Sequence, residues 1–250
     1  MTDPSWRPER AIPISDALDE LLNAVEAISD PPLVDIIDDS QVISTGITAL
    51  DRVCRGGLRV GTVTLLDCAM DAHAQALLYS TARRTQAATV LAGLNRLATT
   101  RWLLAGSSGV AATLIDTGHV SVRNWQAIAS TIAELAEREL HIAEVASIAG
   151  LRHVAATTNP SVLLVERPEL LGEFGFILQN LVRLAQTHRL AILCSTAQAP
   201  GHTDWGLAGL ERVFVDPSTR GSQARLVTDH ETDGMSEALV EIALLEGSVC

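Results

Sequence analysis

Short apolar segments alternate with helical segments along most of this chain, and this alternation limits the folds that it can adopt. The apolar segments, which we interpret as buried strands, cover residues 62–67, 88–92, 140–145, 161–166 and 190–195. The segments between them have apolar residues at helical spacing and cover residues 74–86, 96–105, 107–117, 122–139, 147–157 and 173–187. Strands that alternate with helices predict an α/β fold, in which helices bury both faces of a parallel sheet.

The last part of the chain follows a different pattern. Segments 210–215, 224–229 and 238–245 read as strands that short turns connect, without a helix between them. Consecutive strands joined by short turns pair in antiparallel fashion. We therefore expect a mostly parallel sheet flanked by helices, with antiparallel C-terminal strands along one edge.

The first 41 residues form an acidic arm that differs from the rest of the chain. They hold ten acidic residues and two arginines. We predict one amphipathic helix in the arm, over residues 14–29, which Ser15 can cap and Pro31 ends. One face of this helix is an apolar stripe, formed by Ile14, Leu18, Leu21, Leu22, Val25 and Ile28. This stripe packs either on the protein's own larger domain, which we assign to residues 42–250, or on a neighbouring chain.

Composition excludes several chemistries. All 18 basic residues are arginines, so the chain has no lysine for a Schiff base or for a phosphate-binding P-loop. The net charge of −12 argues against nucleic-acid binding as the main activity. With no membrane-spanning run and no signal peptide, the sequence predicts a reduced, cytoplasmic protein. The four cysteines are far apart and indicate neither a zinc site nor a disulfide framework: Cys54, Cys68, Cys194 and Cys250.

The segment before the first predicted core strand carries the most specific pattern. Residues 44–61 read S-T-G-I-T-A-L-D-R-V-C-R-G-G-L-R-V-G. This order of a T-G turn, a short helix with an L-D pair and a G-G-L turn resembles the DnaB-type replicative helicase family, whose C-terminal domain is a RecA-fold ATPase. The resemblance implies a RecA-like fold for the larger domain.

Three further segments are similar to the same family and extend the likeness over residues 14–250. Residues 102–125 resemble the family's helical insert, residues 163–166 stand where its Walker B strand would lie, and residues 238–245 look like its last strand. The arm helix stands where the family has a protruding linker helix. The resemblance implies two kinds of partner, further copies of this chain or a RecA-fold helicase, and a setting in DNA replication or metabolism.

The residues that bind nucleotide in that family are replaced in this chain. The loop at residues 67–75 contains no glycine, although a phosphate-binding loop needs glycines so that backbone amides can converge on the anion. In the alignment that the resemblance implies, Ala74 stands at the P-loop lysine and Gln75 at the magnesium-binding hydroxyl. The other altered positions of this vacated P-loop are Cys68, Asp71 and His73.

Further functional positions of the family also carry different residues. The Walker B aspartate becomes Glu166, which keeps a carboxylate that could bind a metal ion or pair with Arg167, and we favour the pair. The catalytic glutamate, the phosphate-sensing glutamine and the two basic residues that reach a neighbour's nucleotide correspond here to Asn95, Ala197, His230 and Thr232.

These combined losses predict a chain that neither hydrolyses nor binds nucleotide and needs no cofactor. We interpret it as a structural or regulatory subunit that assembles with itself or with an active RecA-fold ring. One alternative is a residual ATP-dependent DNA helicase, in which Glu166 holds magnesium beside ATP. Another alternative is ATP-independent binding of single-stranded DNA. The net charge of −12 and the short, non-basic connection at residues 171–175 argue against DNA binding.

Overall fold

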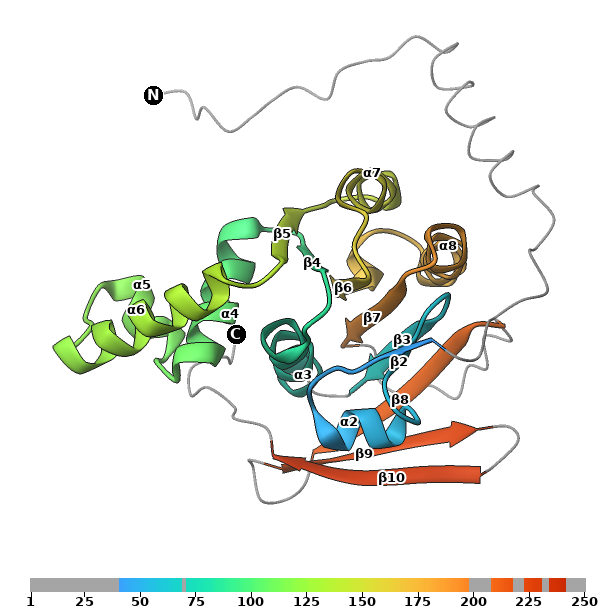
Figure 1. Ribbon diagram of the computed structural model, residues 1–250, viewed down its shortest axis with the longest axis horizontal. Coiled ribbons are helices and arrows are strands. Elements are labelled where there is room, and N and C mark those ends of the chain that lie inside the picture. Colours follow the sequence, from blue (N-terminus) through green and yellow to red (C-terminus); the bar gives the residue numbers. More distant parts are fainter. Residues whose placement is uncertain (1–40, 69–70, 198–207, 218–222, 231–233, 242–250) are drawn as a thin grey trace, which may run out of the picture. The chain divides into compact units, whose positions relative to one another are not determined.

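The computed structural model describes residues 41–68, 71–197, 208–217, 223–230 and 234–241 (Figure 1). The helix predicted over residues 14–29, its apolar stripe and Thr232 lie outside these residues, and they remain predictions. In the described part of the chain, no helix is both long and apolar enough to cross a membrane.

A single eight-stranded sheet forms the centre of the described fold, with the strand order β10-β9-β8-β3-β7-β6-β4-β5. The strands from β8 to β5 pair in parallel, whereas β9 pairs with both β8 and β10 in antiparallel fashion. This mostly parallel, RecA-like sheet with antiparallel C-terminal strands confirms the predicted α/β fold class. The strands are β3 (Val63–Asp67), β4 (Thr89–Gly93), β5 (Leu140–Glu144), β6 (Val162–Glu166), β7 (Ala191–Thr196), β8 (Leu210–Pro217), β9 (Gln223–His230) and β10 (Gly234–Glu241).

Helices cover both faces of this sheet, as the alternating pattern predicts. Helices α2 and α3 lie over one face and α7 and α8 over the other, while α4, α5 and α6 form a projecting group (Figure 1). The helices are α2 (Thr48–Val53), α3 (Asp71–Arg84), α4 (Arg96–Ser108), α5 (Ala112–Thr117), α6 (Val122–Ala136), α7 (Ile148–Thr158) and α8 (Phe174–His188), with the short 3-10 helix η1 (Pro168–Leu170) between β6 and α8.

Several predicted boundaries are wrong. The helix predicted over residues 107–117 begins only at Ala112, because α4 continues to Ser108 and ends at Gly109 in a left-handed conformation. Helix α3 begins at Asp71 rather than at residue 74, because a polar first turn carries no apolar periodicity that marks it in the sequence. Strand β10 begins at Gly234 rather than at residue 238, because its backbone pairs with β9 from the turn onward, in the register Gly234 to His230. Backbone pairing extends a hairpin past its apolar residues, so hydrophobicity alone underestimates its length.

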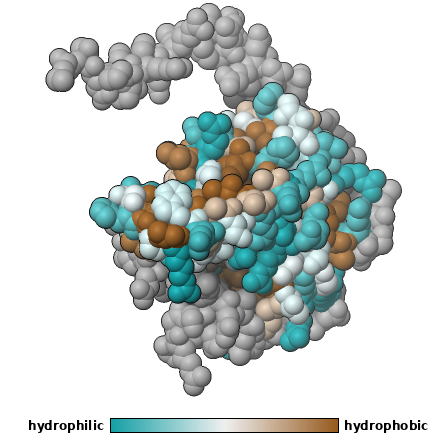
Figure 2. All heavy atoms as spheres, turned by 60° about the vertical axis from the view of Figure 1, so that its left-hand side comes forward, coloured by the Kyte–Doolittle hydropathy of each residue, from teal (hydrophilic) through white to brown (hydrophobic). Residues whose placement is uncertain are grey.

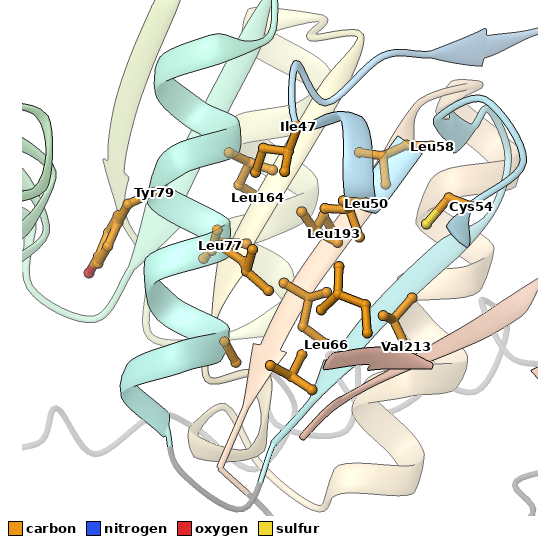
Figure 3. Packing of buried hydrophobic residues seen from close by; sticks show 14 of the residues in the cluster. Ile47, Leu50, Cys54, Leu58, Leu66, Leu77, Tyr79, Leu164, Leu193 and Val213 are labelled. Atoms are coloured by element: carbon orange, nitrogen blue, oxygen red, sulfur yellow. The ribbon is translucent and has the colours of Figure 1, made fainter. Parts of the chain in front are cut away.

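The core consists of two apolar clusters, one on each face of the sheet. Alternate residues of a strand point to opposite faces, so Leu66 lies in the cluster under α2 and α3, while Leu65 lies in the cluster under α7 and α8. Figure 3 shows Leu66 with Leu193 of β7 and Leu77 of α3, all of which are at most 2% exposed. Burial on both faces explains why these strands are mostly apolar.

The segment that resembles the helicase lead-in has a structural function here. The Asp51 carboxylate accepts hydrogen bonds from Ser44 Oγ at 2.6 Å, Thr45 N at 2.8 Å and Thr45 Oγ1 at 2.7 Å. Gly46, at φ +73°, approaches so closely that an added Cβ would lie 2.6 Å from Arg84 Cβ. The T-G and L-D residues therefore hold the turn before α2 against the end of α3. The turn also brings together two short antiparallel strands that the sequence analysis does not predict, β1 (Val42–Ile43) and β2 (Leu58–Arg59).

Candidate functional site at the carboxyl edge of the sheet

The carboxyl ends of the parallel strands are where ligands bind in open α/β sheets. In this chain β3 ends at Asp67 and β6 ends at Glu166, while β7 lies between them. Two acidic side chains thus stand at the edge where a RecA-fold ATPase would bind nucleotide. Each of them is held by other side chains of the protein.

Asp67 is paired with an arginine from the neighbouring strand. Its side chain is only 4% exposed, and its Oδ2 accepts a hydrogen bond from Arg212 Nη2 of β8. The Arg212 guanidinium carbon also lies 4.9 Å from the ring centroid of Phe214, within the range of a cation–π contact. Strand β3 therefore ends in an ion pair within the protein, in which the Arg212 guanidinium balances the charge of the Asp67 carboxylate.

Glu166 is held by two hydroxyl groups from different helices. Tyr79 of α3 donates to Oε1 at 2.7 Å, and Thr99 of α4 donates to Oε2 at 3.1 Å. Tyr79 is 9% exposed and Thr99 is 1% exposed. Figure 3 shows the Tyr79 ring on the side of α3 away from Leu66 and Leu193, with its hydroxyl directed out of the apolar cluster.

The end of β4 leaves no space for a side chain beside this carboxylate. A Cβ added at Gly93 would lie 2.3 Å from Thr99 Oγ1 and 2.5 Å from Glu166 Oε2. The pair of Glu166 with Arg167 stays a prediction. Arg167 Nε lies 3.4 Å from Glu169 Oε1 of η1. The contacts around Glu166 are those expected of a carboxylate that ties three elements together.

Replacing Tyr79 with phenylalanine tests the strength of this connection. The change keeps the ring and removes one hydrogen bond to a carboxylate, so we expect a loss of about 1–2 kcal/mol in the free energy of unfolding. Urea denaturation followed by circular dichroism measures it. The same change in a Glu166→Ala background should cost clearly less, and equal costs in the two backgrounds would contradict the assigned bond.

The residue at the P-loop lysine position of the implied alignment, Ala74 in the first turn of α3, is buried. Ala74 is 0% exposed and belongs to the apolar cluster under α3, and Cys68 at the end of β3 is 1% exposed in the same cluster. Gln75 is half-buried, and the Asp71 side chain is not among those described. The position that should carry the lysine therefore packs against apolar residues.

His73 is a buried histidine that lacks a polar contact. It is 2% exposed, and neither ring nitrogen has a hydrogen-bond partner in the part of the chain that the structure describes. Burial lowers the pKa of this imidazole from its ordinary value of 6.5, because desolvation disfavours the charged form. We expect it to be neutral at pH 7.

The lowered pKa of His73 makes stability depend on pH in a defined direction. Below about pH 6.5 the unfolded chain binds a proton at this residue before the folded protein does, so the free energy of unfolding falls as the pH falls toward the lowered folded-state pKa. We expect His73→Leu to remove this component, and to raise stability at pH 7 by about 1–2 kcal/mol because no polar atoms remain unpaired. Urea denaturation at pH 5, 6 and 7 tests both effects. Identical pH profiles for the two proteins would show that the histidine is solvated.

The remaining sequence-predicted positions have structural roles or lie apart from this edge. Asn95 caps α4, with its Oδ1 accepting from Ala98 N at 2.9 Å. The Ala197 backbone N–H donates to Glu169 Oε1 at 3.3 Å, which joins the end of β7 to η1. His230 ends β9 at its hairpin with β10, and its side chain is not among those described.

Sequence reasoning missed the residues that occupy this edge. Tyr79 was the one with a detectable signal, because it is the only tyrosine and a helix-borne tyrosine in an apolar segment needs a partner for its hydroxyl. For the others no sequence pattern indicates the contact, since they come from separate elements: Thr99, Glu169 and Arg212.

Among the described residues, this edge presents two carboxylates, Asp67 and Glu166, that other side chains of the protein already contact. Within the described ranges, no three His, Cys, Asp or Glu residues come together in a way that could hold a metal ion. No protein-family model matches the chain, and a search of curated proteins also finds no match.

Proposed function

We propose that this protein is a catalytically degenerate, DnaB-helicase-like subunit that does not hydrolyse nucleotide. In this proposal it serves as a structural or regulatory component in DNA replication or metabolism. It assembles either with further copies of itself or with a RecA-fold helicase.

The observation that carries the proposal is the occupation of the carboxyl edge by the protein's own groups. Arg212 neutralises Asp67, the hydroxyls of Tyr79 and Thr99 take up both oxygens of Glu166, and the buried Ala74 stands at the lysine position. A magnesium–phosphate complex at this edge would have to break these contacts. The site would also have to stabilise phosphate charge without any lysine.

Several independent losses support the absence of hydrolysis. Removing one preorganised group that stabilises transition-state charge costs on the order of a hundredfold in rate at comparable sites. Asn95, which takes the place of the catalytic glutamate, uses its oxygen to cap a helix and has no carboxylate to accept a proton from water. A neighbouring subunit could replace only some of the missing groups.

The retained scaffold supports a role in assembly. The chain has a RecA-like sheet, and its Asp51 carboxylate holds the turn of the segment that resembles the helicase family. The residues that bind and hydrolyse nucleotide in that family are replaced. The arm helix predicted over residues 14–29 adds an amphipathic segment that needs an apolar surface to pack against.

Two measurements on the full chain test this proposal. Titration calorimetry with ATP and magnesium should give no binding heat at millimolar nucleotide, and sustained phosphate release would contradict the proposal. Size-exclusion chromatography with light scattering should show an assembly, or a complex with a RecA-fold helicase. A protein that is monomeric at every concentration and binds no such helicase would overturn the assembly role.

A further inference from the structure

Helix α6 has a second apolar face that the described fold does not cover. Its inner face packs against α4 and the sheet through Ile128, Thr131 and Leu135. On the outer face, Val122 is 78%, Trp125 56% and Ile132 52% exposed. Figure 2, which brings the projecting helices forward, shows hydrophobic residues at the surface of this part of the molecule. Grouped exposed apolar side chains of this size mark interaction surfaces.

The spacing of the outer face is that of a helix–helix contact. An outer stripe, defined as Val122, Trp125, Ala129, Ile132 and Ala136, repeats in alternating steps of three and four residues. These are the a and d positions of a heptad, which face a partner helix in coiled-coil packing. All five residues are exposed, so the stripe is accessible in the single chain.

We propose that the outer stripe of α6 binds the same stripe of a second copy of this chain, with the two helices antiparallel and a two-fold axis near Ala129. The proposal rests on the self-assembling form of the proposed function and names the surface that mediates it. A two-fold contact uses the same surface on both copies, so the stripe must be self-complementary.

The distribution of large and small residues about Ala129 meets this requirement. In an antiparallel pair centred there, Val122 lies level with the partner's Ala136, and Trp125 lies beside the partner's Ile132 and Ala133. Ala129 faces its own copy, where a small side chain lets the two backbones approach. The contact therefore joins apolar side chains throughout, with small residues at its centre and opposite Val122.

The charges beside the stripe favour the antiparallel orientation and a second copy. Arg123 lies at the start of α6 and Glu137 directly follows its end, and both are exposed. An antiparallel pair brings each Arg123 near the partner's Glu137, and it also opposes the two helix dipoles favourably. A parallel pair would instead place arginine beside arginine. The acidic arm would bring further negative charge to Glu134 and Glu137, which makes it the weaker candidate for this surface.

Disulfide trapping tests the contact and its orientation in the full chain. The background carries Cys250→Ser and keeps the buried thiols Cys54, Cys68 and Cys194. Under mild oxidation we expect Ala129→Cys to form a covalent dimer. Ala136→Cys alone should not, because the two copies of residue 136 would be about 21 Å apart along the antiparallel pair. Efficient cross-linking of both single variants would indicate a parallel pair and overturn the proposal.

Affinity measurements by analytical ultracentrifugation provide the second test. We expect a reversible dimer of twice the 26.6 kDa chain mass, and Trp125→Glu should raise its dissociation constant about tenfold or more. Phe176→Glu, which changes a 40% exposed aromatic residue on α8, is the matched control and should leave the dimer intact. Arg123→Glu and Glu137→Arg should each weaken the dimer, and the double variant should restore it.

Two results would overturn the assignment of the dimer contact to the outer stripe, without affecting the proposed lack of hydrolysis. One is an assembly that Trp125→Glu leaves unchanged and Leu18→Asp abolishes, which would place the contact on the arm. The other is an assembly that both variants abolish while Ala129→Cys does not cross-link. That result would indicate that the arm helix binds the outer stripe. A chain that stays monomeric at every concentration would overturn the contact and the self-assembling form together.

Discussion

Replacing Ala74 with lysine should destabilise the protein by about 3 kcal/mol or more and should not create ATP binding. The sequence alignment places this residue at the P-loop lysine, so the substitution restores the family's residue at that position. Ala74 is fully buried in the apolar cluster under α3, however, and a lysine there would overfill the packing and bury an ammonium group without a partner. Thermal and urea denaturation measure the first effect, and titration calorimetry with ATP and magnesium measures the second.

Ala72→Lys is the matched control for this substitution. Ala72 is half-buried in the same first turn of α3, where a lysine side chain can reach solvent, so the cost should stay below about 1 kcal/mol. An Ala74→Lys protein that keeps wild-type stability and binds ATP at millimolar concentration would contradict the proposed internal position of Ala74. It would also return the residual-ATPase hypothesis to consideration.

Replacing Arg212 with methionine should cost about 3–5 kcal/mol in the free energy of unfolding. Methionine keeps most of the apolar stem but leaves the Asp67 carboxylate, which is 4% exposed, without its cation. Breaking a buried ion pair by removing one partner is expensive because the remaining charge stays buried and uncompensated. Guanidinium or urea denaturation of the purified variant tests this value.

The double variant with Asp67→Asn separates the ion pair from the packing around it. When the remaining charge is also removed, the cost of Arg212→Met should fall to about 1–2 kcal/mol, a coupling of at least about 1 kcal/mol between the two positions. If Arg212→Met costs the same with and without the Asp67 charge, the pair is not what stabilises this end of β3.

The elements that the sequence predicts well are those whose burial produces a clear pattern. Strands β3, β6 and β7 are covered on both faces and are therefore mostly apolar, and α8 shows a clear helical stripe. The pair β1 and β2 was not predicted because each strand has only two residues, and their pairing depends on the turn that Asp51 organises.

The sequence predicts where the candidate site lies, but not which side chains contact one another there. Strand ends identified Glu166 as a residue at the carboxyl edge, since this follows from local pattern and fold class. The partners of Glu166 lie 87 and 67 positions away in sequence, at Tyr79 and Thr99, and their approach depends on how α3 and α4 pack. Alignment to a family similarly predicts which residue replaces a lysine, but only packing shows that Ala74 faces the interior.

The ion pair between Asp67 and Arg212 also affects how this chain could change over evolutionary time. Phosphate binding at this strand end would require a flexible, glycine-rich loop after β3, with the end of the strand free to accept a ligand. Each single substitution in that direction passes through a less stable protein, because losing either partner leaves the other buried in an unfavourable setting. Once such a pair has formed, selection for stability alone retains it, and a different chemistry at this strand end becomes reachable only through compensating changes elsewhere.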